Sequence, residues 1–304
     1  MEKLADVRLR MRSVEGIGEV CRTLTTVASA KLAQTRDRAL GARVYACRLR
    51  EILARQQHAA RTAGVDPTSF SPLMAERPEV HTIDLVVVGA DRGLCGGYNL
   101  AVGREARQFA IHKEAAGIDV RAITRGHRAE QYMQRTTSLP IIDATSWTRA
   151  GVADADVDWL LDRITRDFLG GEVEEVWVCY TTFLSTFRRE PVVVRVLPVM
   201  PAAIEEAESL RALGWDYEPS QAACVAELLE AFVRLQVEDV LLEAFASEQA
   251  ARMVTMQEAT ERADRTLADL RVAYNRLRRE SITADLVGVL VSGRMRKEAK
   301  TDEG

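Results

Sequence analysis

The feature that most constrains this chain is the stretch from Gln221 to Val287, which contains neither proline nor glycine. Apolar and charged residues alternate along it at helical spacing, which predicts one continuous helix. At 1.5 Å per residue, roughly 70 residues would make a rod of about 105 Å, several times the length of an ordinary helix. Such a helix cannot lie inside a globular domain of a 304-residue chain, so we expect it to project and to need a partner.

A second long helical pattern begins at the N-terminus and fades near His58. Its apolar residues follow the 3-4 alternation of a coiled-coil seam, and the simplest geometry pairs it antiparallel with the C-terminal helix. Gly18 stands where the seam expects a large side chain. Because each of Gly16 and Gly18 costs about 1 kcal/mol relative to alanine, we expect this segment to be soft or to be approached closely by another backbone. Small residues follow, and we expect Ala30 to be buried among them. The apolar seam positions are Leu4, Val7, Met11, Val14, Cys21, Leu24 and Ala28.

Short strands and amphipathic helices replace the long helical patterns between residues 79 and 200. Irregular connectors at 64–78 and 200–219 flank this region, and Ser220 is a plausible N-cap for the long helix. The alternation of strands and helices predicts an inserted α/β domain with a partly parallel sheet. The expected strands cover 83–89, 119–124, 139–142, 175–183 and 191–197, the expected helices 99–116, 126–134 and 152–169, and residues 184–189 suit a hairpin turn.

Composition excludes several classes of protein. No run approaches 18 apolar residues and the N-terminus lacks a signal-peptide core, so we expect a soluble chain. Five scattered cysteines without a CxxC pair argue against structural zinc and a disulfide framework, and favour a reducing compartment. Residues 1–61 hold 13 basic and 6 acidic residues, but the arginines are spread around a helix with almost no aromatic residues between them, so an acidic protein surface fits better than nucleic acid.

One loop, Gly89 to Gly97, follows an expected strand and precedes an expected helix, the position where nucleotide folds bind phosphate. It matches neither the dinucleotide fingerprint nor the P-loop. Cys95 could act there as a nucleophile at a helix N-terminus, where the pKa of a thiol falls, but a tight structural turn is the favoured interpretation. The four histidines, His58, His81, His112 and His127, show no metal-ligand spacing. We therefore predict no catalytic, cofactor-binding or metal residues.

Two motifs connect this pattern to a known family. The segment Asp91-Arg92-Gly93-Leu94-Cys95-Gly96-Gly97-Tyr98-Asn99 and the helical segment from Phe245 to Met256 together resemble the γ subunit of F-type ATP synthases. Their order and separation agree with that family, and the resemblance covers nearly the whole chain. Smaller matches lie at Val27 to Leu32, Tyr217 to Ser220, Tyr274 to Arg276, Ile282-Thr283 and Ser292-Gly293.

The resemblance implies a central-stalk rotor that couples rotation of an ion-driven c-ring to ATP synthesis or hydrolysis. It implies a coiled coil of residues 1–60 and 220–294, with a Rossmann-like α/β domain at 79–200. The implied partners are the α, β and ε subunits and the c-ring, with peripheral attachment to the cytoplasmic face of a bacterial plasma membrane. Asp91, Arg92, Gly93, Leu94, Cys95, Gly96 and Gly97 would form a structural turn, and the proposed contacts with the α and β subunits are Arg22, Leu24, Thr25, Lys31, Arg278, Arg279 and Thr283.

The sequence departs from the family along the expected stalk. Leu24-Thr25-Thr26 replaces a basic run that contains Met-Lys-Met, Arg278-Arg279 replaces an Arg-Gln pair, and Gly288 lies close to the end of the pattern. The charged tail from Arg294 to Gly304 is expected to be disordered. Two alternatives remain open, namely a divergent γ-like paralogue that acts as an assembly scaffold and a phosphate- or nucleotide-binding α/β protein.

Overall fold

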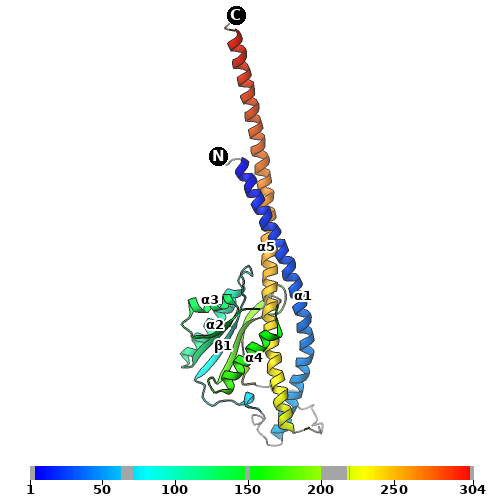
Figure 1. The fold of residues 1–304 in the computed structure, drawn as a ribbon, viewed down its shortest axis with the longest axis vertical. Helices are drawn as coiled ribbons and strands as arrows, with labels where there is room; N and C mark the ends of the chain where they lie inside the picture. The colour runs from blue at the N-terminus through cyan, green and yellow to red at the C-terminus, as the bar shows by residue number, and fades with distance from the viewer. Residues whose placement is uncertain (1–3, 63–70, 148–150, 200–217, 219, 302–304) are drawn as a thin grey trace. The chain divides into compact units, whose positions relative to one another are not determined.

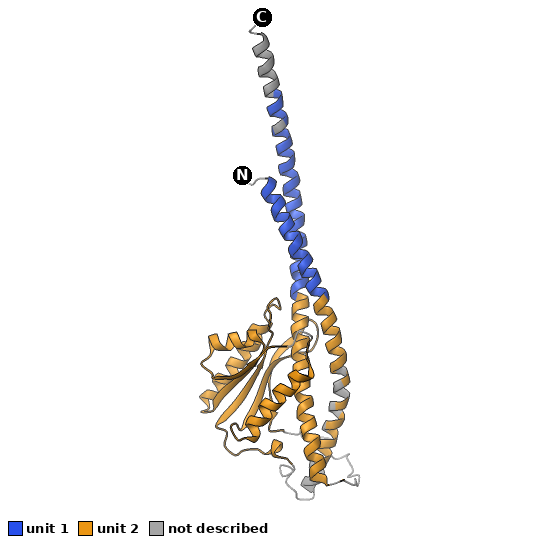
Figure 2. Cartoon of the chain, in the orientation of Figure 1, with its two compact units in different colours: residues 1–26, 255–304 blue, residues 27–254 orange. Residues whose placement is uncertain are grey.

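The computed structural model describes residues 4–62, 71–147, 151–199, 218 and 220–301. The chain divides into two compact units (Figure 2). Residues 1–26 and 255–304 form one, which we call the helical unit, and residues 27–254 form the other, which we call the mixed unit. Two long helices, α1 (Leu4–Thr62) and α5 (Gln221–Thr301), contribute to both units.

The mixed unit contains a five-stranded sheet with the strand order β3-β2-β1-β4-β5. Figure 1 labels β1 and the helices around the sheet. The first four strands in sequence pair in parallel, and β5 runs antiparallel to β4 after a hairpin. The strands are β1 (Thr82–Val88), β2 (Asp119–Arg125), β3 (Ile141–Thr145), β4 (Glu175–Phe183) and β5 (Arg189–Leu197). The helices between them are α2 (Tyr98–Ala115), α3 (His127–Thr136) and α4 (Asp154–Leu169), and a short 3-10 helix, η2 (Pro72–Met74), precedes β1.

Both faces of the sheet are covered by helices, so its central strand β1 is apolar along almost all of its length. Ile83, Leu85 and Val87 face a core formed with α2 and α3. Val86 and Val88 face the opposite core, to which α4, α5 and part of α1 contribute. This burial on both faces explains why the run from Ile83 to Val88 is apolar except for Asp84, whose buried carboxylate pairs with Arg121.

Within the mixed unit, α1 and α5 pack antiparallel. The side chains of Gln56 and Gln221 form a hydrogen bond of 3.0 Å, and Arg38 pairs with Glu238 at 3.0 Å. Residue numbers on α1 therefore rise as those on α5 fall. Ser220 caps α5, since its hydroxyl oxygen accepts a hydrogen bond of 3.3 Å from the amide of Ala223, and the predicted cap is confirmed.

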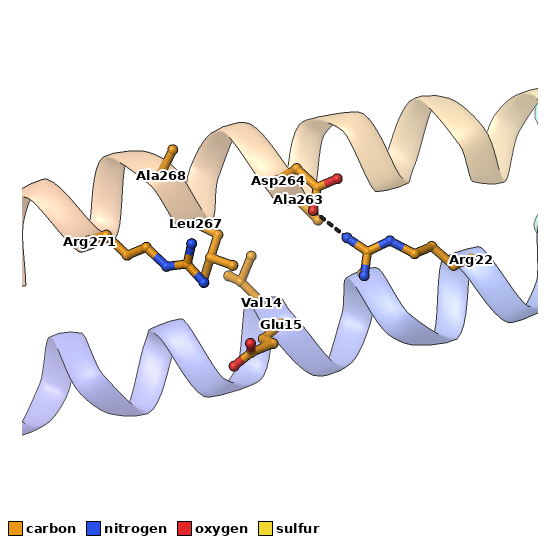
Figure 3. A pocket seen from close by; sticks show the side chains of 9 residues that line it. Val14, Glu15, Arg22, Ala263, Asp264, Leu267, Ala268 and Arg271 are labelled. Carbon is orange, nitrogen blue, oxygen red and sulfur yellow. Dashed lines mark hydrogen bonds and ion pairs between the residues drawn. The ribbon is translucent and has the colours of Figure 1, made fainter.

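The helical unit consists of the start of α1 and the later part of α5. Val7 and Cys21 are buried in their contact, as the seam predicts. Gly18 faces Ala263, whose Cβ would lie 3.5 Å from a Cβ added to the glycine. Figure 3 shows Arg22 beside Asp264, and Val14 with Glu15 toward Leu267 and Arg271, around a hollow of about 360 Å³. A hollow therefore lies beside Gly18, where the seam lacks a large side chain.

The sequence predicted every strand and helix of the α/β region, with differences at their ends. The third strand, expected at 139–142, lies at Ile141–Thr145.

The expectation of a disordered tail from Arg294 is wrong as far as Thr301, because α5 continues to that residue. The expectation that Ala30 is buried is also wrong. Ala30 is exposed, while Ala28, two residues earlier, is buried, because two residues turn a helix by about 200°. Among the described residues, no helix is long and apolar enough to cross a membrane.

Candidate functional site

The two motifs that carry the family resemblance meet in the mixed unit. The loop after β1, which contains Asp91 to Gly97, lies against α5 at the part of the second motif that precedes Thr255. Arg252 of α5 donates a hydrogen bond of 3.4 Å to the carbonyl oxygen of Gly93. The Tyr98 hydroxyl group donates one of 3.0 Å to the carbonyl oxygen of Ala244. Segments about 150 residues apart in the sequence therefore form one junction, which we call the motif junction.

The loop of this junction is held by its own polar contacts. The carboxylate of Asp91 accepts hydrogen bonds from the backbone amides of His127 and Trp147, at 3.0 and 2.8 Å. Asn99 accepts a hydrogen bond of 2.9 Å from the amide of Ala90. The backbone is left-handed at Leu94 (φ 63°) and Gly96 (φ 57°), the second of which suits glycine. These contacts support the expectation of a structural turn.

Cys95 does not have the environment of a nucleophile. Its side chain is 2% exposed, and burial raises the pKa of the thiol. A helix N-terminus lowers the pKa of a thiol, but here burial in apolar surroundings has the larger effect. The Asn99 amide group donates to its sulfur at 3.2 Å, so Cys95 is a buried packing residue of the turn.

A buried ion pair lies on the α5 side of the junction. Arg252 Nη1 and Glu248 Oε1 are 2.6 Å apart, and their side chains are 12% and 8% exposed. Burial raises the pKa of Glu248, while the positive charges of Arg252 and Lys31 oppose that shift. The Lys31 ammonium group also lies over the Phe245 ring, 5.9 Å from its centroid. Lys31, a proposed contact residue, is thus held against α5 of its own chain.

The motif junction occupies the edge of the sheet where comparable folds bind ligands. In open α/β sheets a ligand binds outside the carboxyl ends of the strands, where the strand order reverses. Here that point lies between β1 and β4. Ala251 of α5 packs there in the same core cluster as Ala90, Cys95 and Tyr98. The protein's own helix therefore fills the position that a nucleotide would need, which disfavours the nucleotide-binding alternative.

In the described part of the chain, no three His, Cys, Asp or Glu side chains come together in a way that could hold a metal ion. Arg121 gathers three carboxylates at the opposite part of the sheet, those of Asp84, Asp167 and Glu172 at 2.8, 2.9 and 3.1 Å. This network joins β1, β2 and α4. Its charges are satisfied within the fold, so its contribution is structural.

The remaining proposed contact residues lie in the helical unit. Arg22 is exposed but forms a 2.5 Å ion pair with Asp264 of α5. Leu24 and Thr25 are half-buried, and the Thr25 hydroxyl group donates to the carbonyl oxygen of Cys21 at 2.9 Å. The structure therefore places Arg22 to Thr25 on the flank of the helix pair, with part of each side chain open to a partner.

The later part of α5 presents an open surface. Arg278, Arg279 and Thr283 are all exposed. Their neighbours Ile282, Leu286 and Leu290 are also exposed, at 49%, 60% and 70%. Several adjacent apolar side chains in water are unusual for a free surface, and such patches mark protein contacts. This segment therefore has the character of a surface that another protein covers.

Sequence reasoning identified the two motifs but not their contact. Tyr98, Trp147, Glu248 and Arg252 were not singled out as functional residues. The hydrogen-bond partners of Tyr98, Trp147 and Arg252 on other elements lie far away in the sequence. The available signal was a charged Glu248 and Arg252 pair at i, i+4 on α5. Such a pair normally indicates exposed helix surface, which is why the sequence alone did not reveal the burial.

Comparison with known proteins agrees with this architecture. A family model described as ATP synthase matches residues 3–294. The ATP synthase gamma chain of Anaeromyxobacter sp. (strain Fw109-5) is 33% identical over 293 residues, which are 96% of this chain and 98% of that protein. The ATP synthase gamma chain of Chlorobaculum tepidum is 33% identical over 294 residues, covering 94% and 96% of the two chains.

Solved structures share the fold at low sequence identity. A chain of the Euglena gracilis mitochondrial ATP synthase aligns with a TM-score of 0.61 and 15% identity, over 97% of this chain and 96% of that one. A chain from the central stalk and c-ring of the Tetrahymena thermophila mitochondrial ATP synthase aligns with a TM-score of 0.56 and 17% identity, over 79% and 99%. The near-complete family match and the curated relatives above 30% identity together establish that the chain belongs to the ATP synthase gamma chain family.

Proposed function

We propose that this chain is the central-stalk rotor subunit of an F1Fo ATP synthase. It couples ion-driven rotation of a c-ring to ATP synthesis or hydrolysis in a ring of three α and three β subunits. The observation that carries the proposal is the motif junction, where α5 fills the ligand edge of the α/β domain through Ala251 and Arg252. This packing ties the α/β domain to the long helix, which suits a mechanical role, and family membership identifies that role.

In this proposal the chain supplies no catalytic group and acts by contact. A shaft whose faces differ presents a different surface to each surrounding subunit, and turning it shifts the conformational equilibrium of each site by differential contact. The exposed residues Arg278, Arg279 and Thr283, with Arg22, Leu24 and Thr25, are the proposed contacts with the α and β subunits. The exposure of the α5 residues supports this role. A direct contact of Lys31 with a partner stays a prediction, because its ammonium group lies over Phe245.

The proposed partners are the α, β and ε subunits and the c-ring, and the proposed location is the cytoplasmic face of a bacterial plasma membrane, reached through the complex. Co-purification tests this assembly. A tagged full-length chain should bring down α, β and ε subunits from its own source. Recovery of the folded chain without any of these subunits would overturn the proposal.

The alternative function is that of an assembly scaffold. It is based on Leu24-Thr25-Thr26, which replaces the basic run of the family. Reconstitution into proton- or sodium-loaded vesicles separates the two functions. We expect ATP hydrolysis by the complex to drive ion pumping, because the motif junction and the open α5 surface are both present. An assembled complex that hydrolyses ATP without pumping would favour the scaffold.

A further inference from the structure

The hairpin between β4 and β5 carries a large apolar side chain that is not buried in the fold. Phe187 is 83% exposed, the highest value among the large apolar side chains that the structure describes. Leu184, at the start of the same turn, is 51% exposed. An exposed phenylalanine gives up much of the hydrophobic free energy that burial of its ring would provide. Two such residues on one short turn mark a candidate contact surface.

This turn is fixed by hydrogen bonds. The carbonyl oxygen of Arg188 accepts from the amides of Leu184 and Ser185, at 3.3 and 2.9 Å. The Ser185 hydroxyl oxygen accepts from the amide of Arg188 at 3.0 Å, and Arg189 donates to the carbonyl oxygen of Thr186 at 2.6 Å. The turn is therefore ordered before any partner arrives, which lowers the entropic cost of binding through it.

The charge around Phe187 indicates the chemistry of the partner. Arg188 is 73% exposed and pairs with Glu190 at 3.0 Å. Arg189 uses its guanidinium group on a backbone carbonyl and, within the described residues, is in no ion pair. The turn thus presents an aromatic ring beside the exposed Arg188, the half-buried Arg189 and the carboxylate of Glu190, with one positive charge in excess. Aromatic residues and arginine are enriched in the parts of interfaces that carry most of the binding energy.

The position of the turn also suits a contact with another protein. Phe183, where β4 ends, packs against Leu32 of α1 and against Ala246 and Ala250 of α5. The turn therefore emerges beside the paired helices. The loop after the neighbouring parallel strand β1 emerges at the same edge of the sheet, and its Leu94 is 61% exposed.

We propose that the hairpin turn from Leu184 to Arg189 docks onto another protein subunit, with Phe187 inserted into an apolar depression whose rim carries carboxylates. The inference rests on the proposed function, because it requires the chain to be surrounded by other subunits. It goes beyond that function in assigning a contact to this turn. Arg188 and Arg189 supply the charge that the acidic rim complements.

Photo-crosslinking in the assembled complex tests the contact directly. The full-length chain carrying benzoylphenylalanine in place of Phe187 is assembled with the α, β and ε subunits and the c-ring from its own source, irradiated and analysed by mass spectrometry. The matched control carries the same probe in place of Ile111, which is 49% exposed on α2. We expect position 187 to crosslink to one acidic peptide of a partner subunit, in higher yield than position 111.

A crosslink to lipid, to a neutral or basic peptide, or a yield no higher than that of position 111 would overturn the inference while the assembly itself stands. A chain that fails to assemble in its wild-type form would overturn the proposed function, and the docking contact with it. The two failures are therefore distinguishable.

Two substitutions give an independent measurement. Phe187→Ser should weaken the affinity of the full-length chain for the other subunits at least about tenfold, as expected for a buried aromatic anchor, whereas Ile111→Ser should leave it unchanged. Arg188→Glu should lower the association rate and its dependence on salt. Because Phe187 and Arg188 are exposed, the unfolding temperature of the isolated chain should not change. Equal affinity for the Phe187→Ser variant and the wild-type chain would contradict the proposed anchor.

Discussion

Glu248 and Arg252 lie one turn apart on α5 and form an ion pair of 2.6 Å in the interior of the protein. The same arginine reaches the carbonyl oxygen of Gly93 in the loop after β1. This pair therefore links the long helix to the α/β domain. Burial of both charges makes the link sensitive to the loss of either partner, since an uncompensated buried charge is costly.

Arg252→Ala should lower the free energy of unfolding by about 3–5 kcal/mol, because it leaves the carboxylate of Glu248 buried without its partner. Urea denaturation of the full-length chain measures this change. Arg276→Ala is the matched control, since Arg276 pairs with Glu280 at the same i, i+4 spacing but both side chains are exposed, where such pairs contribute about 0–1 kcal/mol. Equal effects of the two substitutions would show that the Glu248 pair is not buried.

Ala28→Glu should disrupt the contact between α1 and α5, because Ala28 is 1% exposed and a buried unpaired carboxylate is strongly unfavourable. Ala30→Glu should be close to neutral, since Ala30 is exposed on the same helix. Thermal unfolding of the two variants distinguishes these positions. A larger loss of stability in Ala30→Glu would place the helix seam on the wrong face.

Gly126→Ala should destabilise the chain by more than about 3 kcal/mol, because the position combines a left-handed backbone with a steric clash. Its φ angle is 98°, and an added Cβ would lie 2.4 Å from the carbonyl oxygen of Gly89. Gly117→Ala is the control, since its φ angle is 80° but nothing lies within 4 Å of an added Cβ. Strain alone there should cost about 1 kcal/mol. Chemical denaturation of both variants measures the difference.

Gly18→Leu should slow hydrogen exchange in the first part of α1, because its side chain would fill the hollow between Val14 and Leu267 and remove a helix-destabilising glycine. The second effect alone is worth about 1 kcal/mol. Gly16→Leu should slow hydrogen exchange only through the removal of a glycine from the helix, since an added Cβ at Gly16 meets nothing within 4 Å. Protection that rises equally in both variants would show that the hollow does not limit the stability of the helical unit.

The stability of the α/β domain should depend on pH through Asp84. Burial raises the pKa of this carboxyl group from 3.8 to about 6, against the opposing effect of Arg121. The folded state therefore binds a proton between about pH 6 and 4, where the unfolded state is still ionised, so this group adds stability as the pH falls through that window. The neighbouring charges are Arg121, Asp167 and Glu172 around Asp84, with Arg163 and Asp143 beside Asp167.

Asp84→Asn removes this titration. The free energy of unfolding of the wild-type chain, relative to that of the variant, should rise between about pH 6 and pH 4, as measured by urea denaturation in steps of pH. A tenfold change in the acid dissociation constant between the unfolded and folded states corresponds to about 1.4 kcal/mol. A difference between the two proteins that stays constant over this range would show that Asp84 titrates at its ordinary pKa.

The sequence by itself determined the local structure of this protein. Unbroken helical periodicity after Gln221 predicted α5, and the apolar run from Ile83 to Val88 predicted a central buried strand, because spacing and side-chain type act on the backbone within a few residues. The hairpin between β4 and β5 and the cap at Ser220 follow from the same short-range chemistry. The two motifs identified the family before any contact between them was known.

Only the tertiary structure decided which of these local features meet. Burial depends on partners that are distant in the sequence, so the burial of Glu248 and the position of Lys31 over Phe245 could not be predicted from periodicity. Periodicity could not predict the role of the loop from Asp91 to Gly97 either, because this loop lies in the sequence where a phosphate-binding turn would lie. Whether such a loop binds a ligand depends on what packs against it, and here α5 of the same chain does so through Ala251 and Arg252.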